Sequence, residues 1–234
     1  MSTTLKYEKV SAPGKTFLSG VFEWMGLGLG ITALVSWLFS SSPVLLSSLV
    51  TQTGLTGFGY VVMFAPLIFV LIMSIGFNKL SSAALTLLFL IYAGIMGISL
   101  SFIFLIYTDE SIFKTFITAA AMYAGMGIIG YTTKTDLTKM GSFLIMALIG
   151  IIIASVVNVF LKSDTTSYVI SFISVIVFCG LTAWDMQKLK KISVEESSDA
   201  EGRSKLGILG ALTLYLDFIN LFLSLLRLTG RERR

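Results

Sequence analysis

Long apolar stretches alternate with short polar ones along almost the whole chain. Most of the apolar stretches reach or approach 20 residues, and a helix of about 20 residues crosses the roughly 30 Å hydrocarbon core of a bilayer. The pattern predicts seven transmembrane helices, over residues 17–39, 58–77, 82–106, 113–131, 141–161, 167–187 and 206–228. Because the connections are short, neighbouring helices are expected to be antiparallel. The predicted fold class is an all-α membrane protein.

The same pattern divides the chain into three parts. We expect an N-terminal tail over residues 1–16, a seven-helix transmembrane domain over 17–230, and a short basic tail over 231–234. The longest polar segment, residues 188–205, is expected to connect the sixth and seventh spans. Pro43 is predicted to lie in a loop.

Composition supports a bilayer as the solvent of most of this surface. The chain is 55% hydrophobic, has a mean hydropathy of +0.90 and carries only 13% charged residues, which is too little charge to cover a soluble domain of this size. Its net charge of +4 comes from short basic loops, which suit a membrane surface and not nucleic acid. The chain has no histidine, so any proton sensing falls to carboxylates.

The glycines cluster inside apolar spans and not in a phosphate-binding loop. No strand precedes them, so that no nucleotide or other cofactor is expected. Small residues in membrane helices favour close helix packing. We assign that role to the two clusters, which comprise Gly26, Gly28 and Gly30 in the first span and Gly125, Gly127 and Gly130 in the fourth.

The positions of lysine and arginine predict the orientation. With the N-terminus in the cytoplasm, eleven of the seventeen basic residues lie on the cytoplasmic side. Four arginines at the C-terminus oppose this arrangement, and a last segment that dipped in and returned would resolve the conflict. The length of residues 206–228 favours a full crossing. We predict a multi-pass protein of the cell membrane with a cytoplasmic N-terminus.

Charged residues inside the apolar spans are few, and each one is informative. We assign Glu23, Asp109 and Glu110 to interfaces, and Asp136 to a solvated loop. Two others are different: Asp217 sits 11 residues into the seventh span, and Asp185 sits in the last turns of the sixth.

Each of these two aspartates belongs to a polar stripe on an otherwise apolar helix. On the seventh span the stripe includes Thr213, Asp217 and Asn220, and on the sixth it includes Thr182 and Asp185. Lipid would leave such stripes without hydrogen-bond partners, so they are expected to face protein or water. The simplest arrangement turns the two stripes toward each other.

Two facing aspartates would form a proton-dependent contact. Two ionised carboxylates side by side repel, so the pair is expected to share one proton. Loss of that proton would push the helices apart, or a cation would replace it. In the alternative interpretation, Asp217 only fixes helix packing through a hydrogen bond to Asn220 or to a helix backbone.

Four segments resemble a known family. LTLYLDFINLFLSLLRLTG (212–230) resembles the C-terminal signature of the Bax inhibitor family, and GLTAWDMQKLKKI (180–192) is similar to its sixth span. GYTTKTDLTKMGSFLIMALIGIIIASVVN (130–158) and WMGLGLGITALVSW (24–37) are similar to its bacterial branch. The resemblance covers nearly the whole chain.

The resemblance implies a central C-terminal helix surrounded by the other six. It also implies a pH-dependent cation leak, chiefly of calcium, gated by an aspartate pair that corresponds to Asp185 and Asp217; these two would also hold calcium transiently. A basic residue after the second span latches the sixth-span aspartate in relatives. Only Lys79 occupies that neighbourhood here, and lysine cannot reproduce the bidentate grip of arginine.

Other functions fit the sequence less well. An intramembrane aspartyl protease would need Gly-x-Gly-Asp and Pro-Ala-Leu motifs, and residues 214–217 read LYLD, so we expect no enzyme activity. A coupled transporter would show an inverted repeat. Some bacterial relatives are instead regulators that bind membrane proteins, such as a quality-control membrane protease, and this alternative to a channel remains open.

Overall fold

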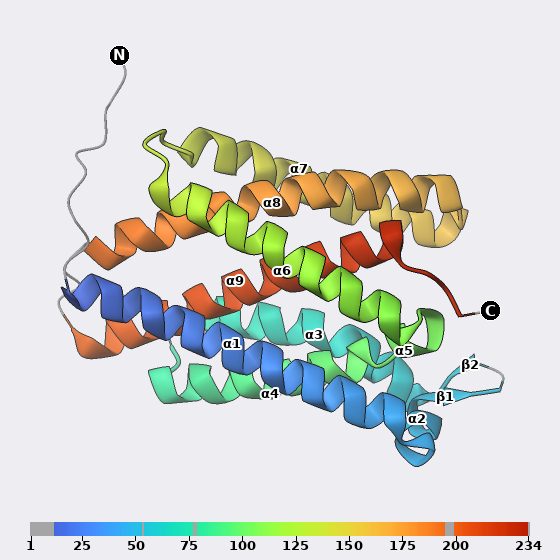
Figure 1. The fold of residues 1–234 in the computed structure, drawn as a ribbon. Helices are drawn as coiled ribbons and strands as arrows, with labels where there is room; N and C mark the ends of the chain where they lie inside the picture. The colour runs from blue at the N-terminus through green and yellow to red at the C-terminus, as the bar shows by residue number, and fades with distance from the viewer. Residues whose placement is uncertain (1–11, 53, 77–78, 195–198, 234) are drawn as a thin grey trace. The chain divides into compact units, whose positions relative to one another are not determined.

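The computed structural model describes residues 12–52, 54–76, 79–194 and 199–233, and helices dominate this part of the chain (Figure 1). Seven spans in these ranges are long and apolar enough to cross a membrane. They are α1 (Ala12–Ser41), α3 (Gly57–Gly76), α4 (Ser82–Leu100) with α5 (Ile103–Ile106), α6 (Asp109–Thr132), α7 (Thr138–Leu161), α8 (Asp164–Val194) and α9 (Ala200–Thr229). The predicted all-α membrane fold is confirmed.

The last two helices are longer than their apolar stretches. α8 continues to Val194 and α9 begins at Ala200, so most of the polar segment 188–205, which separates the two spans, is itself helical. Hydropathy marks the hydrocarbon layer, whereas lysine and glutamate are good helix formers that let a helix continue into water. Leu189 and Ser193, one turn apart, are buried and hold the end of α8 against protein.

The connection after α1 also has structure that the sequence did not predict. Pro43 was assigned to a loop, but it begins α2 (Pro43–Leu49), where its missing N–H costs no helical hydrogen bond. Ser42 caps this helix by accepting a hydrogen bond from the Leu45 N–H. Two short antiparallel strands follow, β1 (Val50–Thr51) and β2 (Gly54–Leu55).

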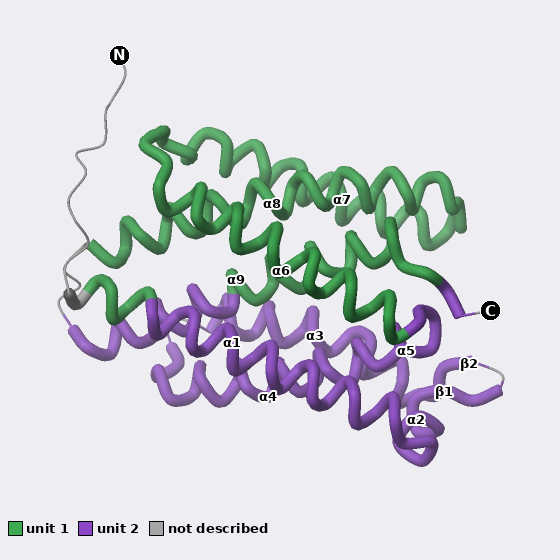
Figure 2. The backbone as a smooth tube through the Cα atoms, in the orientation of Figure 1, with its two compact units in different colours: residues 1–18, 109–196, 213–231 green, residues 19–108, 197–212, 232–234 purple. Residues whose placement is uncertain are grey.

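The chain folds into two compact units, and α9 contributes to both (Figure 2). Unit 2 comprises Ser19–Thr108, Ser197–Leu212 and Glu232–Arg234. Within it, the Thr32 hydroxyl donates to the Ala93 carbonyl at 2.9 Å and joins α1 to α4. Ser82, the first residue of α4, donates its N–H and its hydroxyl to the Glu201 carboxylate at 2.6 and 2.8 Å, so that α9 caps α4.

Unit 1 comprises Met1–Leu18, Asp109–Glu196 and Thr213–Arg231, and in it α8 packs against both α6 and α7. Glycines bring these helices close. A Cβ at Gly130 of α6 would overlap the Ala183 backbone, and one at Gly141 of α7 would overlap the Trp184 ring. The predicted packing role is therefore confirmed for Gly130.

Four glycines of the two predicted clusters do not pack in this way. A Cβ at any of them would meet nothing within 4 Å, so close packing was the wrong interpretation for Gly26, Gly30, Gly125 and Gly127.

The C-terminal end of α9 is held against α6 in unit 1. The Arg231 N–H donates to the Ser111 hydroxyl at 2.8 Å, which places the end of α9 beside the start of α6. α9 is one continuous helix of 30 residues, long and apolar enough to cross a membrane, and the chain does not reverse within it. The cytoplasmic side of the N-terminus and the central position of α9 remain predictions.

Candidate functional site

The end of α8 is held in a fixed rotation by its neighbours in unit 1. Ala183 lies against Gly130 and Trp184 against Gly141, on two different helices. Between these contacts and the polar end of the helix lies Asp185, whose side chain is only 6% exposed. The carboxyl group of Asp185, which precedes three lysines on the same helix, is thus directed into the protein and not into water.

Asp217 is positioned by an aromatic cluster on α6 and α9. Phe218 packs edge-to-face on Phe116 and Tyr123, with ring centroids 5.4 and 5.6 Å apart. The Tyr123 hydroxyl donates to the Leu214 carbonyl at 3.2 Å and ties α6 to the same stretch of α9. Asp217 itself is 5% exposed.

The side chains of Asp185 and Asp217 come close enough in unit 1 for their carboxyl groups to interact. An ionised carboxylate has acceptors only, so a hydrogen bond between two carboxyl groups requires a proton on one of them. With both groups ionised, the same geometry would hold two negative charges side by side away from water. A close contact between the two carboxyl groups is therefore favoured when one of them carries a proton.

One atom of this pair has no partner. Asp217 Oδ2 is buried and makes no hydrogen bond within the described residues. Leaving a polar atom of this kind unsatisfied is costly in a membrane protein, where lipid offers no donor. The site can thus accept one more donor or a cation at this oxygen.

Two further residues lie close enough to the pair to interact with it electrostatically. One is Lys188, which interacts with Asp185 and whose ammonium lies 5.4 Å from the centre of the Trp184 ring. The other is Tyr123, which is buried beside both aspartates. Sequence reasoning missed Tyr123 because a single tyrosine in an apolar span forms no stripe; its only signal was a hydroxyl in the middle of a span.

The predicted supporting residues are placed as follows. The Thr182 hydroxyl donates to Phe178 O at 2.7 Å, and the Asn220 amide donates to Leu216 O at 2.8 Å. Both are bonds within their own helices, and neither reaches the aspartates. Thr213 is half-buried on α9. Lys79 is exposed in the connection between α3 and α4, in unit 2, and its latching role remains a prediction.

One turn beyond the pair, α8 holds the connection between α6 and α7. The buried Gln187 side chain donates to Thr135 O and accepts from the Leu137 N–H, both at 2.9 Å. Nearby, Lys190 Nζ donates to Tyr131 O at 2.7 Å. These bonds hold the connection on the same helical segment that carries Asp185.

Asp136, in that connection, is exposed as predicted but is also well bonded. It accepts hydrogen bonds from the Thr138 hydroxyl at 2.6 Å and the Thr138 N–H at 3.0 Å, and Lys191 Nζ lies 3.2 Å away. These donors lower the pKa of Asp136 from 3.8 to about 2, and the Thr138 hydroxyl has the largest effect. Its interpretation as a merely solvated residue was incomplete.

The pair does not form a complete metal site. Within the described residues no group of three or more His, Cys, Asp or Glu side chains could hold a metal ion. Calcium in proteins takes six to eight oxygen ligands, and two carboxyl groups supply at most four. Any calcium ion here would need water or backbone oxygens for the rest of its shell.

Comparison with known proteins agrees with this architecture. A family model described as inhibitor of apoptosis-promoting Bax1 matches residues 14–234. The chain is 45% identical over 221 residues to the inner membrane protein YbhL of Escherichia coli K12, an alignment that covers 94% of this chain and 93% of the relative. It is 43% identical over 236 residues to the uncharacterized protein RP147 of Rickettsia prowazekii strain Madrid E, covering 100% and 97%. With a family model over nearly its full length and seven membrane spans, the chain is a multi-pass membrane protein that belongs to the Bax inhibitor family.

Proposed function

We propose that this protein is a pH-sensitive cation leak channel of the cell membrane, with calcium as its main ion, and not an enzyme. The gate in this proposal is the pair formed by Asp185 and Asp217. The observation that supports it most is the close approach of these two buried carboxyl groups. The relative named as an inner membrane protein supports the location.

The gate works through the single proton between the two carboxyl groups. While the proton is bound, the hydrogen bond holds α8 against α9. When it is lost, two negative charges face each other in a poorly solvated site, and the repulsion favours separation of the helices. A passing cation can replace the proton, and the unpartnered Oδ2 of Asp217 is a ready ligand for it.

The small number of carboxylate ligands suits passage and not storage. A tight calcium site surrounds the ion with six to eight oxygens. Two aspartates would attract a cation but leave most of its water in place, so that the ion can leave again. Conduction needs this balance between entry and release.

Flux measurements on the purified protein test the proposal. Proteoliposomes that contain the wild-type chain are expected to release calcium at a rate that changes between about pH 6 and pH 8, and protein-free liposomes are not. Absence of any such flux, together with co-purification of a membrane protease, would favour the alternative of a non-conducting regulator.

Asp185→Asn separates gating from packing. The asparagine amide can still donate to Asp217 and has nearly the same volume, so we expect insertion into the membrane and thermal stability close to those of the wild type. The variant should nevertheless lose the pH dependence of flux. A gross loss of stability would instead show that the aspartate serves mainly to pack α8.

A further inference from the structure

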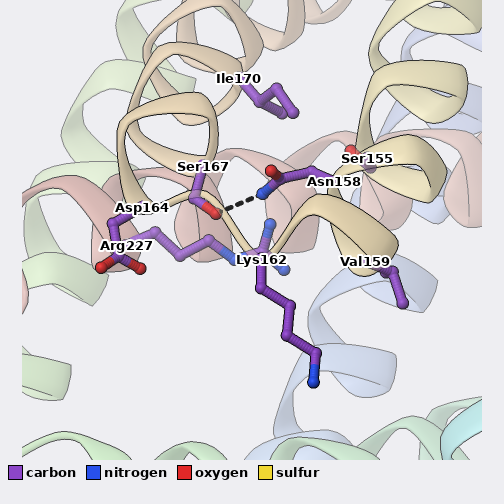
Figure 3. Close-up of a pocket in the computed structure, with 8 residues that line it drawn as sticks. All are labelled: Ser155, Asn158, Val159, Lys162, Asp164, Ser167, Ile170 and Arg227. Carbon is purple, nitrogen blue, oxygen red and sulfur yellow. Dashed lines mark hydrogen bonds between the residues drawn. The ribbon is translucent and has the colours of Figure 1, made fainter.

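The other end of unit 1 contains a polar pocket that the gate does not use. It has a volume of about 420 Å³ and lies where α7 ends, α8 begins and the last turns of α9 approach (Figure 3). Asp164 lines it, and 21 residues separate Asp164 from Asp185 along α8, or about 32 Å of helix. The pocket is thus a separate site.

The charges of this pocket have no partners within it. Lys162 and Arg227 supply two positive charges and Asp164 supplies one negative charge. The ion pairs found among the described residues involve other side chains, so these three groups remain available to a ligand. A ligand with both an anionic and a cationic group would find a counter-charge for each.

The backbone of the pocket is held in an unusual conformation. Lys162 has φ of 50°, and among the described residues no other non-glycine residue has a positive φ. This left-handed conformation costs free energy for a residue with a side chain. The Asn158 side chain stabilises the turn, since it donates to Ser167 Oγ at 2.7 Å and to Ser163 O at 3.2 Å. The turn thereby holds a lysine at a position that would favour glycine.

The surface beside the pocket is apolar and open. Only 6% of the most apolar stretch of α7 is buried, and Phe160, next to the pocket residue Val159, is 82% exposed. Tyr168 and Phe172 of α8 are exposed on the same unit. The 24 residues of α7 span about 36 Å, slightly more than the hydrocarbon core, so Lys162 falls at the level of the lipid headgroups.

We propose that this pocket binds the headgroup of a zwitterionic aminophospholipid. Its phosphodiester lies against Lys162 and Arg227, its ammonium group lies against Asp164, and its acyl chains follow the exposed apolar side chains of α7 and α8. An acidic phospholipid fits less well because Asp164 would repel it.

Single-lipid binding measured by native mass spectrometry tests this assignment. The full-length protein in detergent is titrated with phosphatidylethanolamine and with phosphatidylglycerol that carry identical acyl chains. We expect the wild type to bind the aminophospholipid more tightly, and Arg227→Gln to weaken this binding about threefold to tenfold. Asp164→Asn should weaken binding of the aminophospholipid and strengthen binding of phosphatidylglycerol.

Two variants at the same end of unit 1 serve as controls. Arg231→Gln and Asp109→Asn each remove one exposed charge outside the pocket lining, and both should bind the two lipids as the wild type does. Equal binding of the two lipids, or an Asp164→Asn variant with unchanged preference, would overturn the proposal. Competition by soluble glycerophosphoethanolamine at the same concentration as the lipid would also overturn it, because the pocket would then recognise a soluble zwitterion.

Discussion

Two aspartates of unit 1 show how surroundings decide what a carboxyl group does. Asp136 is exposed and accepts two hydrogen bonds from Thr138, with Lys191 beside it, so that its ionised form is stabilised. Asp217 is buried, and its carboxyl group interacts with that of Asp185. The first carboxylate fastens the connection between α6 and α7, whereas the second belongs to the proposed pH-sensitive gate.

The Asp136 interactions predict a small, pH-dependent contribution to stability. Its pKa is lowered in the folded protein from 3.8 to about 2, so its charge stabilises the fold above about pH 4, and this stabilisation is lost as the pH falls toward 2. Because the side chain is exposed, Asp136→Asn should cost less than about 1 kcal/mol at pH 7. Unfolding in detergent should show this difference shrinking toward pH 2; a difference that stays constant with pH would contradict the assignment.

Gln187 predicts a larger effect that does not depend on pH. Gln187→Ala removes both hydrogen bonds to the connection between α6 and α7, and we expect a loss of about 1–2 kcal/mol in the free energy of unfolding. Lys139→Ala, an exposed position at the start of α7, serves as the control and should change stability little. Equal stability of the two variants would mean that the two hydrogen bonds of Gln187 contribute nothing to stability.

At the scale of helices, close approach is concentrated at single glycines. Gly130→Ala would force a methyl group against the Ala183 backbone, two residues before Asp185, and should destabilise the protein by about 1–3 kcal/mol. Gly127→Ala on the same helix meets no atom within 4 Å and should be neutral or stabilising by up to about 1 kcal/mol. Thermal unfolding of the two variants compares them directly. Similar losses for both would contradict the packing described for α6 and α8.

The helices themselves could be predicted from hydropathy because a helix that spans the bilayer needs about 20 mainly apolar residues. Hydropathy could not locate the end of α8 or the start of α9, where helix propensity and burial of Leu189 extend the helix beyond the apolar stretch. Nor could it distinguish Gly130 from Gly127, since both lie in the same apolar helix. Whether a glycine is a close contact depends on which helix packs against it, as α8 does at Gly130.

For the whole molecule, the proximity of Asp185 and Asp217 could be predicted because polar stripes on two consecutive membrane helices must face protein or water, and the simplest arrangement turns them toward each other. Tyr123 could not, because it comes from α6 and reaches the pair only through tertiary packing. The polar pocket was likewise invisible in the sequence: Arg227 meets the turn after α7 only once α9 is folded beside it. The division into two interleaved units depends on tertiary contacts in the same way.

In the proposed mechanism, one shared proton controls the contact between α8 and α9 and, through it, ion flux. The most direct test compares calcium flux from proteoliposomes that contain wild-type protein, Asp217→Asn, or the control Asp109→Asn between about pH 6 and pH 8. We predict that flux through the wild type and the control changes with pH, while flux through Asp217→Asn stays constant. An Asp217→Asn variant that keeps the wild-type pH profile would contradict a gate controlled by this proton.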